Sequence, residues 1–127
     1  MSAATTTQPY VLSFSVGYLP AMNTSATRRH WSHAHREVKR WRAIVAAQTA
    51  GKRPTRPLER ARVTMIRLSA RAPDHENLAM SFKAALDSLV HCGVLVNDGP
   101  AHVERIYRWD RAAPGRGCVG IKVEEIG

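Results

Sequence analysis

The stretch that decides the fold lies at residues 61–93 and reads ARVTMIRLSARAPDHENLAMSFKAALDSLVHCG. Its first part, residues 61–69, is rich in β-branched and apolar side chains without clean alternation, which predicts a central strand covered on both sides. After Pro73, apolar side chains recur at helical spacing from about residue 78 to residue 91, and Gly93 favours the end of that helix. The buried stripe of this helix is predicted to comprise Leu78, Phe82, Ala85 and Leu89.

The segments on either side predict a small sheet with one more helix. Three further strands are predicted at residues 10–16, 102–109 and 118–124. Apolar side chains at spacings of three and four predict an amphipathic helix over residues 29–49, which Gly51 ends. The expected fold class is α/β, in the order β-α-β-α-β-β, with a mixed sheet of about four strands flanked by two helices. We expect one domain over residues 1–127, with a flexible N-terminus at residues 1–8.

The composition excludes several classes of protein. The chain has 127 residues, with 19 Lys and Arg against 10 Asp and Glu, a net charge of +9. No apolar run approaches the roughly 18–20 residues that span a bilayer, and the N-terminal residues lack the features of a secretory signal. Two cysteines are too few for a disulfide framework or a cysteine-rich zinc site, and no phosphate-binding glycine loop is present. We therefore expect a cytoplasmic protein that binds neither a membrane nor a small-molecule cofactor.

Charge is unevenly distributed along the chain. Residues 1–73 carry 13 basic and two acidic side chains, a net charge of +11, whereas residues 74–127 carry six basic and eight acidic side chains, a net charge of −2. A basic surface favours a polyanionic partner, most often nucleic acid. Four acids fall in one stretch whose only Lys or Arg is Lys83, namely Asp74, Glu76, Asp87 and Asp98. They are either ligands that hold a divalent cation against the phosphate backbone or ordinary helix-end and loop residues.

The motif PDHEN at residues 73–77 is the strongest candidate for chemistry. On an extended chain, Asp74 and Glu76 point to the same side and can converge on one cation. Hard oxygen ligands in small number suit Mg²⁺ or Mn²⁺. Asp98 could complete this site if the fold brings its turn close to the motif. The alternative is that Asp74 or Glu76 caps the helix and that Asp98 only forms a turn.

The residues near the motif can be interpreted in structural or in functional terms. Lys83 and Asp87 lie four residues apart on one helical face, which is typical of a surface ion pair. The functional alternative is that Lys83 contacts a scissile phosphate and offsets its developing charge. His75 lies between the two carboxylates and is interpreted as an outward-pointing bystander. Trp41 lies on the apolar stripe of its helix and is predicted to belong to the core.

The segment from Asp74 to Asp98 resembles the signature of RusA-type Holliday-junction resolvases. In that family a D-x-D-N-L motif opens a helix that carries a lysine and a later aspartate, a glycine ends the helix, and an acidic turn precedes the next strand. The resemblance extends upstream to a strand, a Pro-x-x-Asn loop at Pro20 to Asn23 and a basic helix, and downstream to two closing strands. It therefore covers nearly the whole chain.

The resemblance implies a small homodimeric, magnesium-dependent endonuclease that cuts four-way DNA junctions. By position, Asp74, Glu76 and Asp98 would be the metal-binding and catalytic carboxylates and Lys83 the catalytic lysine. Asn77 and Asp87 would support them. The basic helix and the loop after it would contact DNA phosphates through Arg28, Arg29, Arg36, Lys39, Arg40, Lys52, Arg53 and Arg56.

Two positions depart from the family pattern. Glu76 stands where the family usually has aspartate, so its carboxylate lies one methylene further from the backbone. Lys83 follows Asn77 by six residues, three more than in the short form of the motif, which moves it about one helical turn along nearly the same face.

The resulting hypothesis is a structure-selective endodeoxyribonuclease that uses Mg²⁺, or Mn²⁺, to hydrolyse a phosphodiester in branched DNA. A second hypothesis is a non-catalytic protein that binds branched DNA through a degenerate metal site. A third is a nuclease that acts on flaps or other branched DNA in place of four-way junctions.

Overall fold

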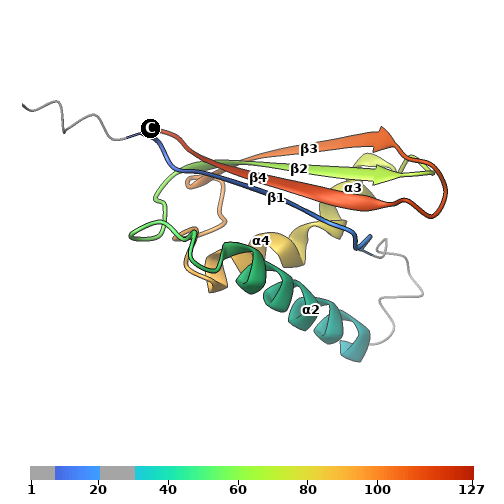
Figure 1. Cartoon of the computed structure of the whole chain (residues 1–127), viewed down its shortest axis with the longest axis horizontal. Helices are drawn as coiled ribbons and strands as arrows, with labels where there is room; N and C mark the ends of the chain where they lie inside the picture. The colour runs from blue at the N-terminus through green and yellow to red at the C-terminus, as the bar shows by residue number, and fades with distance from the viewer. Residues whose placement is uncertain (1–7, 21–30) are drawn as a thin grey trace, which may run out of the picture.

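In the part of the chain that the structure describes, four strands form one mixed sheet and three helices lie beside it. A computed structural model describes residues 8–20 and 31–127, with side chains from residue 35 onward in the second range. The strands are β1 (Val11–Val16), β2 (Ala61–Ser69), β3 (Val103–Arg111) and β4 (Cys118–Glu125), and the helices are α2 (Trp31–Thr49), α3 (His75–Ser81) and α4 (Lys83–His91) (Figure 1). The predicted flexible segment at residues 1–8 lies outside the described residues except for Gln8.

The strand order in the sheet is β1-β4-β2-β3. β2 and β3 run parallel because the chain crosses back over α3 and α4 between them, whereas β4 lies antiparallel between β1 and β2. The predicted α/β fold with a mixed four-stranded sheet is therefore confirmed. The predicted strand bounds agree with the observed ones to within two residues.

The helix predicted from residue 78 to residue 91 is wrong in its start and its continuity. It begins at His75, because the Asp74 side chain caps it, and it is interrupted at Phe82. The backbone N–H of Phe82 donates to the Ala79 carbonyl at 3.2 Å, which is the tighter pattern of a last helical turn. The Phe82 side chain is fully buried, so the interruption directs a large aromatic ring into the core.

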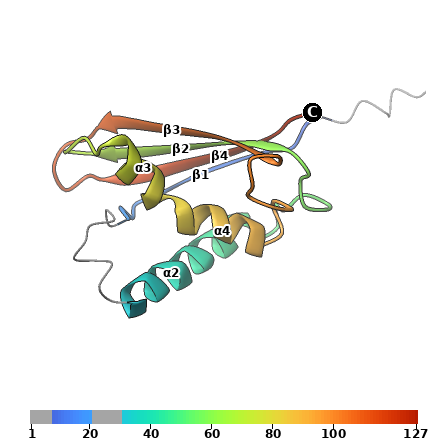
Figure 2. The ribbon, with the colours of Figure 1, turned by 180° about the vertical axis from the view of Figure 1, so that it is seen from behind.

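All three helices cover the same face of the sheet, and the other face is open (Figures 1 and 2). Along β2 the side chains alternate between buried and half-buried, with the odd-numbered residues buried. The prediction that this strand is covered on both sides is therefore wrong. Ile66 and Leu68 are apolar although they point to the open face, and they removed the alternation that a half-covered strand ordinarily shows.

The core lies between the helices and the sheet. The predicted stripe of Leu78, Phe82, Ala85 and Leu89 is buried. Trp41 and Val45 of α2 are also fully buried, and α2 packs against α4. The positive φ angles of Gly51 (73°) and Gly93 (82°) follow the ends of α2 and α4, which confirms both predicted helix ends.

The basic loop between α2 and β2, residues 50–60, is held by hydrogen bonds to the residue that precedes β1 and to the segment after α4. The backbone N–H of Leu58 donates to the Val94 carbonyl at 2.8 Å, and the N–H of Val96 donates to the Leu58 carbonyl at 3.0 Å. The hydroxyl of Tyr10 donates to the Lys52 carbonyl at 2.5 Å. These contacts place the basic loop beside the segment that leads from α4 to Asp98.

Candidate functional site

Asp74 begins α3 as its N-cap. Its backbone is extended, with φ −73° and ψ 165°, and its Oδ1 accepts the backbone N–H of Asn77 at 2.8 Å. The Asn77 amide also donates to Oδ2 at 3.1 Å. The capping alternative for Asp74 is therefore confirmed, and Asn77 supports this carboxylate by donating to both oxygens. Asp74 remains exposed, so each oxygen keeps a lone pair for another ligand.

Glu76 does not share a side with Asp74 in the way the sequence predicted. That argument assumed extended backbone across both residues, whereas α3 begins at His75 and Glu76 lies in its first turn. Residues two apart across the start of a helix lose the period-two alignment of a strand. Glu76 is exposed, and its charge is favourable at the N-terminal end of the helix.

Asp98 lies in a turn that contacts α4 through Asp87. The predicted turn is present, since the Asn97 Oδ1 accepts the backbone N–H of Gly99 at 2.7 Å. The Arg105 guanidinium donates to the Asp98 backbone carbonyl. The carboxylate of Asp98 lies near Asp87 of α4, so the fold brings together two of the four clustered acids.

The pKa of Asp87 is shifted by burial, by its contact with Asp98 and by the other charged residues around it. Burial raises the pKa of Asp87, and a hydrogen bond and charge repulsion from Asp98 raise it further, while the charges of Lys83 and Arg105 lower it. Two carboxylates in contact repel each other when both are ionised. A cation beside them, from a side chain or from solution, relieves that repulsion.

A pocket of about 130 Å³ opens between the helices and β3 at this place. Its lining comprises Ala79, Met80, Lys83, Leu86, Asp98, Arg105 and Tyr107. Lys83 is exposed at the first position of α4, and Arg105 is exposed near the start of β3. The pocket therefore presents two cationic side chains and one carboxylate to the same small volume, with Asp87 close by.

Tyr107 connects this pocket to the start of α3. Its ring lies 6.4 Å from the Phe82 ring and 6.4 Å from the His75 ring, the latter at an interplanar angle of 87°. The interpretation of His75 as an outward-pointing bystander is thus wrong in one respect, because its ring contacts Tyr107 edge to face.

Arg105 and Tyr107 were not among the residues selected from the sequence. They belong to no motif, and only the period-two pattern of β3 places both on the face that the helices cover. The alternation in that strand could have indicated a shared face. The proximity of that face to Lys83 depends on the tertiary structure.

The residues predicted to hold a metal ion do not gather into one group of ligands. Among residues 8–20 and 31–127, no three His, Cys, Asp or Glu side chains are placed to hold one ion. Asp74 and Glu76 lie at the start of α3, while Asp98 lies with Asp87. Magnesium often uses only one or two protein carboxylates and completes its shell with water and substrate phosphate, and the Asp87–Asp98 pair fits that donor set. Magnesium binding stays a prediction.

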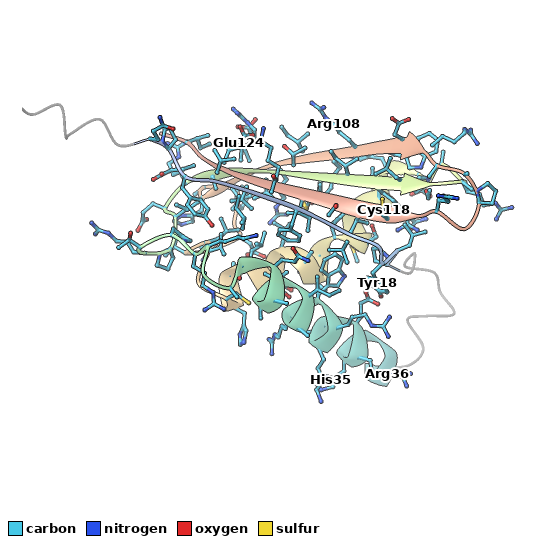
Figure 3. All side chains as sticks on the ribbon, viewed as in Figure 1. Tyr18, His35, Arg36, Arg108, Cys118 and Glu124 are labelled. Carbon is cyan, nitrogen blue, oxygen red and sulfur yellow. The ribbon has the colours of Figure 1, made fainter. Side chains whose placement is uncertain are left out.

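The predicted DNA-binding residues that the structure describes lie on the helix layer and the adjoining loop. On α2 these are Arg36, Lys39 and Arg40, and in the loop they are Lys52, Arg53 and Arg56, all of them exposed. Arg36 extends from α2 away from the sheet (Figure 3). The Arg40 guanidinium lies 4.8 Å from the centre of the Tyr18 ring, so part of its contact surface is already used. Arg28 and Arg29 lie outside the described residues.

Comparison with known proteins adds no family. No model of a known protein family matches the chain, and a search of curated proteins finds no relative. Among the helices in the described part of the chain, none is long and apolar enough to cross a membrane.

Proposed function

We propose that the chain is a magnesium-dependent, structure-selective endodeoxyribonuclease that resolves four-way DNA junctions. The observation that carries the proposal is the pocket between α4 and β3, where Lys83 and Arg105 face Asp98 with Asp87 beside it. Cations that contact a phosphate, next to carboxylates that bind a metal ion, are the parts that phosphodiester hydrolysis requires. The resemblance of residues 74–98 to RusA-type resolvases supports the junction as substrate and a homodimer as the active form, and the composition supports a location in the cytoplasm.

The chain's own residues would position and stabilise the phosphate. Lys83 and Arg105 would contact its oxygens and offset the negative charge that develops in the transition state. The exposed basic residues of α2 and of the loop at residues 52–56 would contact phosphates of the DNA arms, which favours shape over base sequence. A magnesium ion, when bound by the carboxylates, supplies Lewis-acid activation of the phosphate and of water.

The decisive experiment measures cleavage and binding of a synthetic four-way junction by single-residue variants. With Mg²⁺ or Mn²⁺ we expect strand cleavage, and with EDTA we expect none. Asp98→Asn and Lys83→Met should each lower the cleavage rate by about 100-fold or more while junction binding stays within a few fold. Glu59→Gln is the matched control and should cleave like the wild type, because Glu59 is exposed in the loop before β2 and lies outside both the pocket and the open side of the sheet. Wild-type rates in the Asp98→Asn and Lys83→Met variants would contradict the proposal.

Asp74→Asn tests the part of the site that comes from the resemblance. Asparagine is as good an N-cap as aspartate, so this variant keeps the start of α3 while it removes one negative charge. Loss of cleavage with retained junction binding would support Asp74 as a metal ligand. Unchanged cleavage would restrict its role to capping.

A second candidate is a protein that binds branched DNA without cutting it. It is favoured by one observation, namely that Asp74, Glu76 and Asp98 do not form a single group of metal ligands. Tight junction binding without cleavage under Mg²⁺ and under Mn²⁺ would select this candidate. Mapping of products on flaps and three-way junctions separates the third hypothesis, a nuclease for other branched DNA, from both.

A further inference from the structure

The face of the sheet that the helices leave open has a definite set of side chains. Strand register places four rows on it, three running across β1, β4, β2 and β3 and the fourth across β4, β2 and β3. The first row is Val11, Glu124, Arg62 and Glu104, and the second is Ser13, Lys122, Thr64 and Ile106. The third is Ser15, Gly120, Ile66 and Arg108, and the fourth comprises Cys118, Leu68 and Asp110. We call these residues the open face.

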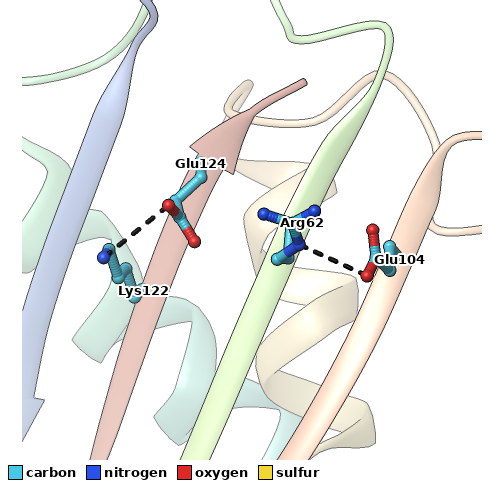
Figure 4. A network of polar contacts seen from close by, with 4 residues as sticks. All are labelled: Arg62, Glu104, Lys122 and Glu124. Atoms are coloured by element: carbon cyan, nitrogen blue, oxygen red, sulfur yellow. Dashed lines mark ion pairs between the residues drawn. The ribbon is translucent and has the colours of Figure 1, made fainter. Parts of the chain in front are cut away.

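The open face is electrically neutral on a strongly basic chain. It carries three cations, Arg62, Arg108 and Lys122, and three anions, Glu104, Asp110 and Glu124, whereas the whole chain has a net charge of +9. Two ion pairs form within it: Arg62 Nε lies 3.3 Å from Glu104 Oε1, and Lys122 Nζ lies 3.7 Å from Glu124 Oε2 (Figure 4). A neutral face of alternating charge is complementary to itself and offers little attraction to the phosphates of a nucleic acid.

The centre of the open face has an apolar projection next to a hollow. Ile66 and Leu68 are only half-buried although they are large and apolar, and Ile106 lies diagonally across from Ile66 on the neighbouring strand. Beside Ile66 stands Gly120, which has no side chain, and a Cβ atom built there meets only the Phe14 carbonyl oxygen, at 3.9 Å. The space that a side chain at Gly120 would occupy is therefore free in the single chain, and we call this space the hollow. An apolar projection beside a hollow is the shape that can fit a copy of itself after a two-fold rotation.

The area of the open face suits a modest interface between two copies. The nine residues of β2 span roughly 30 Å at about 3.3 Å per residue, and four strands about 4.8 Å apart span roughly 19 Å. Two such faces together cover on the order of 1,100 Å², close to the lower limit of about 1,200 Å² for stable interfaces. An interface of this size is consistent with dissociation at roughly micromolar concentration.

We infer that the open face binds the open face of a second copy of this chain, sheet against sheet about a two-fold axis. Ile66 of each copy then lies against the hollow at Gly120 of the other, and the helix layers with their basic side chains face outward on both sides. The homodimer itself belongs to the proposed function, but the choice of surface rests on the charge, shape and area of the open face.

The test is sedimentation velocity of the full chain between about 1 and 100 µM, with no nucleic acid present. The wild type should shift from monomer to dimer across this range, and Ile66→Lys should remain monomeric. Val96→Lys is the matched control, because Val96 is also an exposed aliphatic residue, 41% exposed, but lies outside the sheet. This control should dimerise like the wild type.

A second variant protects the test against misfolding. Gly120→Val fills the hollow with a residue that strands favour and whose Cβ atom has room in the single chain, so it should fold, as judged by circular dichroism, and yet fail to dimerise. Labelling by a thiol reagent gives an independent readout, because Cys118 lies on the open face while Cys92 is buried. The labelling rate of Cys118 should fall as the protein concentration rises in the wild type, and should stay constant in Gly120→Val.

Three results would overturn the inference. They are a wild type that is monomeric at every concentration, a dimer that survives both Ile66→Lys and Gly120→Val, and an open-ended series of larger oligomers. A wild type that stays monomeric would also remove the homodimer from the proposed function, whereas the nuclease activity is decided separately by junction cleavage in the Asp98 and Lys83 variants. A monomeric chain that cuts junctions would retain the proposed nuclease activity and remove only the homodimer with this interface.

Discussion

Tyr18 fastens the segment after β1 to helix α2. Its hydroxyl donates to the Glu37 carboxylate, with both oxygens at 2.6 Å, and its ring meets the Trp41 ring edge to face at 5.9 Å. The Arg40 guanidinium covers the same ring. Burial raises the pKa of Tyr18 to about 12, and the hydrogen bond to Glu37 and the negative charge of that residue act in the same direction against the smaller effect of Arg40.

We predict that Tyr18→Phe lowers the free energy of unfolding by about 1.5–3 kcal/mol at neutral pH, the usual contribution of a hydrogen bond to a charged group. The raised pKa means that the folded state holds this proton more tightly, so the stabilisation is fully present below pH 10 and is lost as the pH rises from 10 towards 12. Urea denaturation of the wild type and of Tyr18→Phe from pH 7 to pH 12 measures this stabilisation. The two curves should converge at high pH, and parallel curves would contradict the assignment.

The contact between Asp87 and Asp98 predicts an opposite pH dependence. The pKa of Asp87 is raised above its ordinary value of 3.8 by burial and by Asp98, so the ionised carboxylate is unfavourable in the folded state. Protonation of Asp87 as the pH falls through its raised pKa therefore stabilises the fold relative to neutral pH. Asp87→Asn should be more stable than the wild type at pH 7, and the difference should shrink as the pH approaches 4.

Thermal unfolding in EDTA at several pH values checks this prediction, with Asp110→Asn as the control. Addition of Mg²⁺ extends it, because a cation bound between Asp87 and Asp98 would stabilise the wild type more than Asp87→Asn. A wild type that is more stable than Asp87→Asn at pH 7 without metal would show that the two carboxylates do not repel each other.

Helix α3 depends on its cap, since it has only seven residues. Asp74→Ala removes the acceptor for the Asn77 N–H and should lower the free energy of unfolding by about 1 kcal/mol, whereas Asp74→Asn should leave it nearly unchanged. Urea denaturation of the two variants provides the measurement. The comparison also separates the structural role of this residue from any role in cleavage, because asparagine keeps an oxygen that accepts the Asn77 N–H while it loses the negative charge and the second acceptor oxygen.

The end of α4 depends on backbone conformation. Gly93 has a φ of 82°, a backbone conformation that residues with a side chain rarely adopt. A Cβ atom at this position would meet nothing within 4 Å. Gly93→Ala should therefore cost about 1–2 kcal/mol of stability from backbone strain alone. Gly17→Ala is the matched control, since that position is equally open and its φ lies outside the left-handed region. Equal melting temperatures for the two variants would contradict the role of Gly93 in ending the helix.

For the molecule as a whole, the distribution of charge predicts where nucleic acid binds. The basic loop after α2 carries the exposed Arg53 and Arg56, while Arg62 and Arg108 lie on the neutral open face. Replacing Arg53 and Arg56 by glutamine should lower the affinity for DNA and reduce the slope of log K against log salt by about 1–2. Replacing Arg62 and Arg108 by glutamine removes the same net charge and should leave the slope of log K against log salt unchanged. Fluorescence anisotropy across a salt series measures both.

Much of the fold could be predicted from local patterns. Residues 61–69 have strand composition, the spacing of Trp41 and Val45 is helical, and Gly51 and Gly93 mark helix ends, because these signals act over a few residues. The covering of β2 could not be predicted in this way. The presence of an apolar residue such as Ile66 in the sequence does not reveal whether its side chain faces a helix or solvent.

The candidate site could be predicted only in part. Asp98, Lys83 and Asp87 were selected by residue type and spacing, and the structure brings them together with Arg105 and Tyr107. The alignment of Glu76 with Asp74 failed because the cap moved the start of the helix by three residues. One-dimensional spacing specifies the direction of a side chain only when the backbone conformation is known, and here a single hydrogen bond decided that conformation.

The amino-acid sequence by itself determined the elements, their order and the separation of charge, since propensity, periodicity and charge count are local properties. Only the tertiary structure decided that the helices of the described residues lie on one face, that Asp98 meets Asp87, and that a neutral, partly apolar face remains open on a chain of net charge +9. Those features arise from strand order and from packing between residues far apart in the chain. The physical reason is that the burial of apolar surface is shared by the whole molecule, so the partner of any one residue depends on how all the elements close around the core.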